Sequence, residues 1–520
     1  MNKESVLDDA EIIRSLKPFS AELLKIYPKS FCRKNGLTYG LIRNPEGKKL
    51  VVMGEKRSVM ADPFYGRCHP HETTLKICDL SPENTDSLMA LFPYTKPVSL
   101  RKHRMTVGTG DRLGVATPGH IRAVRKFDVR PVLAQQSVRE NNQTGRSFKA
   151  MIQDAAWAVF QENYQEGYGA DGDHVKSMEE VRNALNAGVS MVTLDLSEKL
   201  HPEVLDLPKE GTERKFKAEI DAGDAEVILH LSTGKEFLLK GPRGEISIRF
   251  SEEETKRNFL LFHDALDFTE EVYEFIRSYT GYRDVIDFEI SINETPFATS
   301  PEGHLFFVIA LGHRGVRINS LAPRFVGEFQ KGIDYRGDLE SFRGQFYQHA
   351  LIARDYGNYK ISIHSGSDKF SIFPVAGELA KEGLHVKTAG TSWLEAMRLV
   401  ALQDPKLYRE MHRFALSVFR EASMLYHVTT DCGRIPGLEE ISDQELHSFL
   451  DHEDSRQLLH ITYGYLLNAK DGDGKAIFRK RLFRTLTERE EDYWSLLERQ
   501  IESHLLSLGL RRRSLSPFLT

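Results

Sequence analysis

From about residue 105 to residue 403, short apolar runs that end in Gly, Asp, Ser or His alternate with stretches of helical periodicity. This pattern is typical of buried strands that are each followed by an amphipathic helix. Eight such units predict a (β/α)8 barrel of the TIM type in an α/β protein, although an open doubly wound sheet would give a similar local pattern. Their strand segments are MTVGTGDRLG, RPVLAQQS, YGADGDHVKS, VSMVTLDLS, VIDFEISINET, VRINSLAPRF, YKISIHSGSDKFS and HVKTAGTSW.

Three segments depart from this pattern and predict additional parts of the molecule. Residues 1–104 mix short strand-like runs with polar turns, which indicates a small N-terminal α/β cap before the catalytic barrel of residues 105–403. Residues 198–285 are far longer than an ordinary strand-to-helix connection, so we expect an inserted subdomain there. Residues 404–520 carry Leu, Arg and Glu at helical spacing and predict a helical C-terminal extension.

The composition of the chain excludes several classes of protein. The 520 residues are 28% charged and 40% apolar, and 70 Lys and Arg stand against 75 Asp and Glu, a net charge of −5. This balance excludes a disordered chain and argues against nucleic acid as a partner. No apolar run is long enough to span a membrane, the first residues contain no secretory signal, and four scattered cysteines suit a reducing compartment. We therefore expect a cytoplasmic protein with no membrane partner.

The densest polar motif is Asp171-Gly172-Asp173-His174, at the end of the third predicted strand. Its small residues allow a ligand to approach the backbone closely. A histidine beside a carboxylate suits a divalent metal ion next to an acid/base group, with His174 as the ligand and Asp173 as the acid/base. The alternative is a structural Asp–His turn, which is the commoner explanation for an isolated pair.

The seventh predicted strand adds a second histidine at a strand end. His364 is followed by a loop of small residues in which the backbone at Gly366 and Ser367 can bind an anion and Lys369 adds a positive charge. Two histidines at two strand ends favour a metal site more strongly than one. Ser367 and Lys369 are thus candidate substrate-binding residues.

Two further strand ends supply candidate residues. On the fifth strand, Glu289 alternates with apolar neighbours and is expected to face the barrel interior, where a carboxylate needs a partner, a proton or a metal. We prefer Glu289 to Glu294 as a second acid/base, with a buried ion pair as the alternative. After the sixth strand, Glu328 or Gln330 could complete a metal shell.

The same loop after the sixth strand contains two cations. Arg324 and Lys331 suit a carboxylate or phosphate, unless the loop is an ordinary charged surface loop. Weaker candidates for the lining of the site are Asp111, Gln135 and Gln136, each of which is equally well explained as a buried hydrogen-bonding residue.

Five motifs together resemble the tagaturonate epimerase family: GDRLGVATPGH, DGDHVKS, FEISINET, LAPRFVGEFQKGIDY and ISIHSGSDKFS. The resemblance covers about residues 105–400. It implies a barrel enzyme of hexuronate catabolism, an isomerase that interconverts tagaturonate and fructuronate, with a sugar acid as its small-molecule substrate.

Two of the motifs also resemble class II, metal-dependent aldolases. That likeness implies that Asp173 handles a proton and that His174 and His364 bind a divalent metal cation. The third ligand of these aldolases is another histidine, which the matching loop here lacks, so Glu328 or Gln330 would take its place.

The resemblance also implies a mechanism. The two ketoses differ at a carbon that is not adjacent to the carbonyl, so enolisation alone cannot invert it, whereas retro-aldol cleavage and re-addition can. Glu289 would handle protons on the enediolate side. The uronate carboxylate would be held by Arg324, Lys331 or Lys369. The alternatives are a class II-type aldolase, an epimerase of a related sugar acid or sugar phosphate, and a non-catalytic sensor barrel that binds sugar acids.

Overall fold

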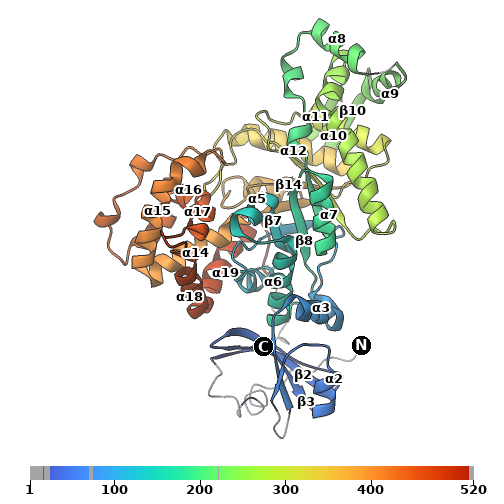
Figure 1. The fold of residues 1–520 in the computed structure, drawn as a ribbon. Helices are drawn as coiled ribbons and strands as arrows, with labels where there is room; N and C mark the ends of the chain where they lie inside the picture. The colour runs from blue at the N-terminus through green and yellow to red at the C-terminus, as the bar shows by residue number, and fades with distance from the viewer. Residues whose placement is uncertain (1–15, 17–23, 70–73, 221, 514–520) are drawn as a thin grey trace.

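The computed structural model describes residues 16, 24–69, 74–220 and 222–513, and a closed barrel of eight parallel strands lies at its centre (Figure 1). The strands are β6 (Met105–Gly108), β7 (Arg130–Ser137), β8 (Gly169–Val175), β9 (Met191–Asp195), β12 (Asp287–Ile292), β13 (Ser320–Pro323), β14 (Lys360–Ile363) and β15 (Leu384–Lys387). They follow chain order around the barrel, and β15 pairs with β6 to close it. The predicted (β/α)8 barrel is confirmed, and the open sheet is excluded.

Helices return the chain from the end of each strand to the start of the next, as right-handed parallel connections require, and a further helix follows the last strand. In chain order they are α4 (Thr117–Val124), α5 (Val138–Thr144) with α6 (Phe148–Gln161), α7 (Met178–Ala187), α10 (Glu252–Tyr279), α11 (Pro301–His313), α12 (Leu339–Asp355), α13 (Phe373–Leu379) and α14 (Gly390–Gln403). Polar caps fix where several of them begin. Ser251, for example, accepts a hydrogen bond from the backbone of Glu254 at the start of α10, and the Glu254 side chain bonds back.

In its described residues, the N-terminal part contains an antiparallel sheet, short helices and a 3-10 turn. Its elements are β1 (Lys25–Lys34), β2 (Leu37–Asn44), β3 (Gly47–Gly54), α2 (Lys56–Ala61), β4 (Arg67–His69), β5 (Thr74–Asp79), α3 (Pro82–Leu91) and η2 (Pro93–Thr95). The strand order is β1-β2-β3-β5-β4. The indole of Trp157 on α6 donates to the Thr85 hydroxyl on α3 at 2.8 Å, which joins this part to the barrel.

Between β9 and α10 the chain builds a projection, drawn in green at the top of Figure 1. It contains η3 (Ser197–Lys199), η4 (Pro202–Asp206), α8 (Lys209–Glu219), α9 (Ala222–Ser232) and a hairpin of β10 (Glu236–Gly241) with β11 (Gly244–Arg249). The long helix α10 then packs against α11 and continues the ring of barrel helices.

The chain after the barrel is helical and lies against the first barrel units. Its elements are α15 (Pro405–Ser423), η5 (Cys432–Arg434), η6 (Leu438–Glu440), η7 (Leu446–Leu450), α16 (Glu453–Ile461), α17 (Tyr463–Asn468), α18 (Arg479–Glu488) and α19 (Glu490–Ser507). Helix α19 packs against α4 and α14, and the Trp494 indole donates to the carbonyl of Val115 at 2.8 Å. This packing brings α16 and the segment after α15 to the mouth of the barrel.

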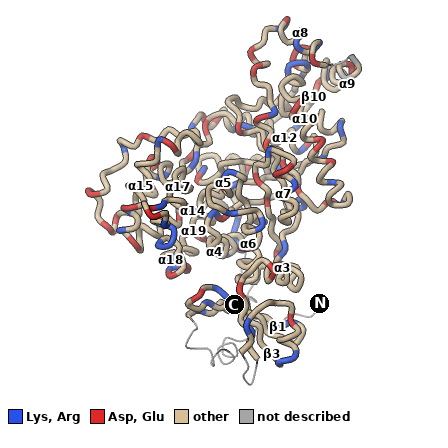
Figure 2. The backbone as a smooth tube through the Cα atoms, viewed as in Figure 1, with Lys and Arg blue, Asp and Glu red and all other residues tan. Residues whose placement is uncertain are grey.

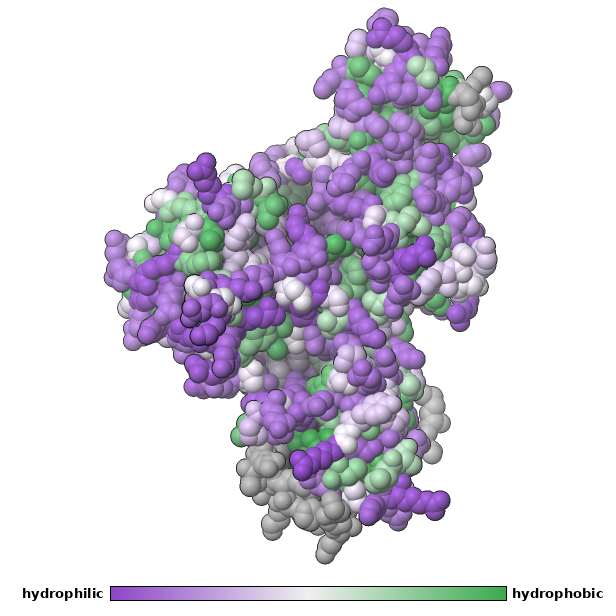
Figure 3. Space-filling model, in the orientation of Figure 1, coloured by the Kyte–Doolittle hydropathy of each residue, from purple (hydrophilic) through white to green (hydrophobic). Residues whose placement is uncertain are grey.

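Positive and negative residues are interspersed over the part of the chain that the structure describes (Figure 2), and hydrophilic residues cover most of the face shown in Figure 3. Among the described residues, no helix is both long enough and apolar enough to cross a bilayer.

Candidate active site at the carboxyl ends of the barrel strands

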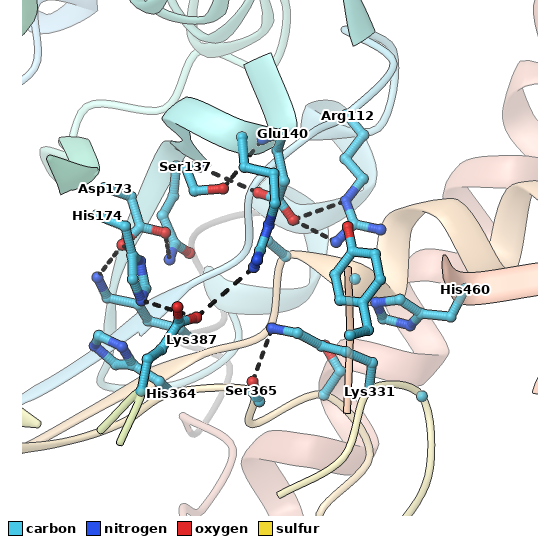
Figure 4. Close-up of a pocket in the computed structure, with 18 of the residues that line it drawn as sticks. Arg112, Ser137, Glu140, Asp173, His174, Lys331, His364, Ser365, Lys387 and His460 are labelled. Atoms are coloured by element: carbon cyan, nitrogen blue, oxygen red, sulfur yellow. Dashed lines mark hydrogen bonds and ion pairs between the residues drawn. The ribbon is translucent and has the colours of Figure 1, made fainter. Parts of the chain in front are cut away.

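A hollow, called here the barrel hollow, lies where the strands of the barrel end. Ser137 and Lys387 are the last residues of their strands, and His174 lies near the end of β8. In a parallel barrel all carboxyl ends meet at one face, so side chains far apart in sequence converge there. Figure 4 shows Asp173, His174, His364 and Lys387 grouped at one side of the hollow, with Arg112, Glu140 and His460 at the other.

Lys387 stands at the centre of a buried network on the floor of the hollow. Its ammonium group lies 2.6 Å from Asp173, 2.8 Å from Glu289 and 2.9 Å from Asp171. It also donates to the hydroxyl of Thr193 at 2.7 Å. One cation therefore compensates three carboxylates that approach it from β8 and β12, which makes their burial tolerable.

The pKa values of Asp173 and Asp171 differ although both carboxylates contact Lys387. Burial would raise the pKa of Asp173, but Lys387 and His174 hold that pKa well below its ordinary value. Burial raises the pKa of Asp171 to about 7, because Lys387 only partly offsets it and Asp173 and Glu289 raise it further. Asp173 is thus ionised at neutral pH, whereas Asp171 titrates near it.

Two imidazoles border the hollow with their ring centres 4.9 Å apart, those of His174 and His364. His174 Nδ1 donates to Asp173 at 2.8 Å and His364 Nε2 donates to Glu289 at 2.8 Å. His174 has a φ of 53° and Ser365 a φ of 51°, a left-handed conformation that is uncommon for such residues and concentrates at functional sites.

The carboxylate of Glu294 and the imidazoles of His174 and His364 could hold a metal ion. Glu294 follows β12 and its carboxylate lies 3.8 Å from His174 Nε2. Burial would raise the pKa of Glu294, but His174, Lys331 and Arg139 lower it to about 2. His364 Nδ1 is buried and has no hydrogen-bond partner among the described residues. Two imidazoles and a carboxylate are donor types that suit a divalent transition metal.

Cations and aromatic rings line the outer wall. Lys331 donates to the hydroxyl of Ser365 at 2.8 Å, and the Arg139 guanidinium stacks on the Tyr426 ring at 4.9 Å. The Nε atom of Arg139 is buried and unpartnered among the described residues. Arg112 instead is neutralised by Glu140, to which its Nε donates at 3.0 Å. Lys331 and Arg139, whose guanidinium lies 3.7 Å from Glu294, are therefore less fully paired than Arg112.

The C-terminal extension completes the wall. Tyr426 and His460 both line the barrel hollow, and both ring nitrogens of the buried His460 lack a partner among the described residues. A second hollow, called here the outer hollow, adjoins the first and shares Arg139, Glu294, Lys331, His364 and Tyr426 with it.

Several residues singled out from the sequence meet in this region. Asp173, His174, His364, Ser367 and Lys331 line the barrel hollow, as does Gln135. Arg324 lines the outer hollow only.

Other candidates lie elsewhere in the network. Glu289 is fully buried beneath the hollow, where it accepts hydrogen bonds from His364 and, at 2.6 Å, from Ser320. Lys369 points away from the hollow and donates to the carbonyls of Gln330, Ile333 and Ser367, and burial lowers its pKa to about 7. It supports the loop rather than facing a ligand.

The loop after β13 does not bring Glu328 and Gln330 to the histidines. The side-chain amide oxygen of Gln330 accepts a hydrogen bond from the Thr429 backbone at 3.0 Å and one from Gln457 at 2.9 Å. The side-chain amide nitrogen of Gln330 donates to Glu328. Glu328 also lies 3.6 Å from His427. Both side chains therefore hold the C-terminal extension, and Glu294 is the carboxylate beside His174.

Asp111 and Gln136 contribute to the structure around the site and do not line either hollow. The Asp111 carboxylate accepts backbone N–H groups of Leu113, Gly114, Ala116 and Thr117 and so shapes the loop after β6. Gln136 is buried and lines neither hollow.

The sequence reasoning missed Lys387, Arg139 and His460. A lysine two positions after His385 on a predicted buried strand was a usable signal, because such a charge requires anionic partners. Arg139 follows the end of the second predicted strand. His460 offered no signal, since its place depends on how the C-terminal helices fold back.

Comparison with known proteins identifies the family. A family model described as tagaturonate epimerase matches residues 27–508. The tagaturonate/fructuronate epimerase of Thermotoga maritima is 38% identical over 494 residues, which cover 95% of this chain and 99% of that protein.

Solved structures agree with this assignment. The glycerol-complexed crystal structure of fructuronate-tagaturonate epimerase UxaE from Cohnella laeviribosi is 43% identical, with a TM-score of 0.89, over 96% of this chain and 99% of that one. The native structure of the same enzyme is 44% identical with the same TM-score and coverage. The chain belongs to the tagaturonate epimerase family of isomerases.

Proposed function

We propose that this protein interconverts tagaturonate and fructuronate by cleaving and re-forming a carbon–carbon bond. The observation that carries the proposal is the convergence of Asp173, His174, His364 and Lys387 on one floor of the barrel hollow, in a chain of this family. Cleavage and re-formation of a carbon–carbon bond require an acid/base group and groups that stabilise negative charge, and this carboxylate, cation and pair of imidazoles can supply them.

We propose further that a divalent metal ion is held by His174, His364 and Glu294. When bound, such an ion would stabilise negative charge on substrate oxygens as a Lewis acid. Asp173 and Glu289 accept hydrogen bonds from the far nitrogens of the two imidazoles and so orient both rings, as second-layer carboxylates do around metal-binding histidines.

Asp173 is the proposed proton acceptor. It takes the proton of the hydroxyl on the carbon to be inverted, and the bond from that carbon to its carbonyl-side neighbour breaks. The bonding electrons remain on the carbonyl-side fragment as an enediolate, and the other fragment becomes an aldehyde. After the aldehyde has turned, the enediolate attacks its opposite face and Asp173 returns the proton to the new hydroxyl. Lys387 holds Asp173 in place throughout.

The substrate carboxylate needs a cationic partner away from the reacting carbons. We propose Arg139 and Lys331 for this role, because both line the barrel hollow and the outer hollow. Burial and the neighbouring Arg139 lower the pKa of Lys331, so an anion between the two groups would be favourable. The outer hollow gives the aldehyde fragment room to turn while its carboxylate remains bound.

The proposal is tested by incubating the purified protein with tagaturonate and following the appearance of fructuronate by chromatography. Asp173→Asn keeps the shape of the side chain but removes the base, so it should lower kcat by at least about 100-fold. Cleavage products that accumulate would indicate an aldolase, and tight binding without turnover would indicate a sensor; either result would contradict the proposal.

A further inference from the structure

A second group of metal-ligating side chains lies outside both hollows, at the base of the projection between β9 and α10. It consists of His201, His263 and Asp264, whose ligand atoms all lie within 4.8 Å of one another. His201 directly precedes η4, and the other two lie on α10. We call these three residues the α10 cluster. None of them lines the barrel hollow or the outer hollow.

The two imidazoles of the α10 cluster are arranged as a pair. Their rings are stacked, with centres 4.7 Å apart and planes inclined by 12°. His201 Nε2 lies 3.0 Å from one oxygen of Asp264, and His263 Nε2 lies 3.3 Å from the other. The same ring nitrogen of each histidine therefore faces the same carboxylate.

Each of the opposite ring nitrogens has an acceptor nearby. His263 Nδ1 is 3.0 Å from the carbonyl of Leu260, which can only accept, so Nδ1 carries the proton. In the neutral ring this leaves a lone pair on His263 Nε2, facing a carboxylate oxygen that also has only lone pairs. His201 Nδ1 lies 3.4 Å from Glu203, which also accepts a hydrogen bond from Lys215 at 3.1 Å.

His201 Nε2 is within hydrogen-bonding distance of the Asp264 carboxylate, so a metal ion would take the place of the proton between them. A cation there would accept all three lone pairs, and the outer acceptors Leu260 and Glu203 match the second layer that commonly orients metal-binding histidines. The side chains of His201, His263 and Asp264 are 29%, 19% and 51% exposed, so an ion can reach them from solvent. We propose that the α10 cluster binds a divalent transition metal ion such as Zn²⁺ through His201 Nε2, His263 Nε2 and the Asp264 carboxylate.

Such an ion would strengthen an existing attachment. The His201 backbone N–H donates to the carbonyl of Leu261 on α10 at 3.1 Å, and Arg257 of α10 donates to the carbonyls of Val204 and Leu205 in η4. The ion would add a cross-link between η4 and α10 at the point where the projection leaves the barrel.

The test is zinc titration of the full-length, metal-stripped protein by calorimetry, with Co²⁺ absorption as a check of the ligand set. His201→Gln and His263→Gln should each lose one zinc per chain while epimerase activity stays unchanged. His313→Gln, which removes an exposed histidine at the end of α11, is the matched control and should bind as the wild type does. Glu203→Gln should weaken the binding about 10-fold.

A separate variant distinguishes this ion from the one proposed in the barrel. Glu294→Gln should leave zinc binding at the α10 cluster intact, whatever it does to activity. Hydrogen exchange provides a local measurement, because zinc should slow exchange in η4 in the wild type and His313→Gln but not in His263→Gln. Unchanged zinc stoichiometry and affinity in both His201→Gln and His263→Gln would overturn the proposal.

Discussion

Replacing Lys387 by methionine tests the account of the barrel floor. Methionine has a similar length and keeps the apolar packing, but it removes the ammonium group from between Asp171, Asp173 and Glu289. Lys387 is 4% exposed, so water cannot replace it readily. Removing one partner of a buried, hydrogen-bonded ion pair typically costs about 3–5 kcal/mol, and we expect Lys387→Met to lose at least that much unfolding free energy near neutral pH.

The pH dependence separates this loss from an ordinary packing defect. Without Lys387 the buried carboxylates repel one another, so their pKa values in the folded variant rise above those of the unfolded chain. The folded variant then binds more protons than its unfolded state, and its stability relative to the wild type rises as the pH falls. One carboxylate that becomes protonated between about pH 7 and pH 5 would restore up to about 2.7 kcal/mol.

The assay is urea unfolding of the wild type and the variant at both pH values. Lys369→Met is the matched control, because this buried lysine contacts carbonyl oxygens and its removal leaves no carboxylate unpaired. The control should lose stability by an amount that changes little over this range. A Lys387→Met loss below about 1 kcal/mol, or one that does not shrink on acidification, would show that Lys387 does not stabilise the buried carboxylates.

Three further predictions concern the substrate and the buried histidines. Arg139→Met should raise KM about 10- to 100-fold with a smaller change in kcat, since one charge-assisted hydrogen bond is lost; an unchanged KM would contradict this role. Gly390→Ala should lower kcat/KM, because the new methyl group would overlap the ring of His460 in the wall of the hollow; full activity would show that His460 moves freely. Burial lowers the pKa of His412 to about 4, so the unfolded chain takes up a proton below about pH 6.5 that the folded chain does not. Its stabilising contribution therefore falls by about 2 kcal/mol between neutral pH and pH 5, and His412→Leu should flatten the pH dependence of unfolding by that amount.

The barrel could be predicted because each of its strands and helices is recognisable from a short stretch of neighbouring residues. Each strand is a short apolar run such as the one ending at His364, and each is followed by a helix-forming stretch, so every unit could be identified without knowledge of the others. The same periodicity placed Glu289 inside the barrel. Parallel strands also bring their carboxyl ends together, which is why Asp173 and His364 were expected at one face.

The parts that escaped prediction depend on contacts that are distant in sequence. Gln330 was a reasonable metal ligand by position, but Thr429 and Gln457 of the C-terminal extension occupy its side chain. His460 reaches the hollow only because α16 folds back over the barrel. Sequence periodicity predicts that a segment is helical, but it does not give the place where that helix packs.

In the proposed reaction, the carbon that is inverted in the substrate keeps its hydrogen while a carbon–carbon bond breaks. Tagaturonate labelled with deuterium at that carbon tests it directly, by NMR or mass spectrometry of the fructuronate that forms. The account predicts full retention of the label, because the C–D bond is never broken. Loss of deuterium to water in step with turnover would contradict it.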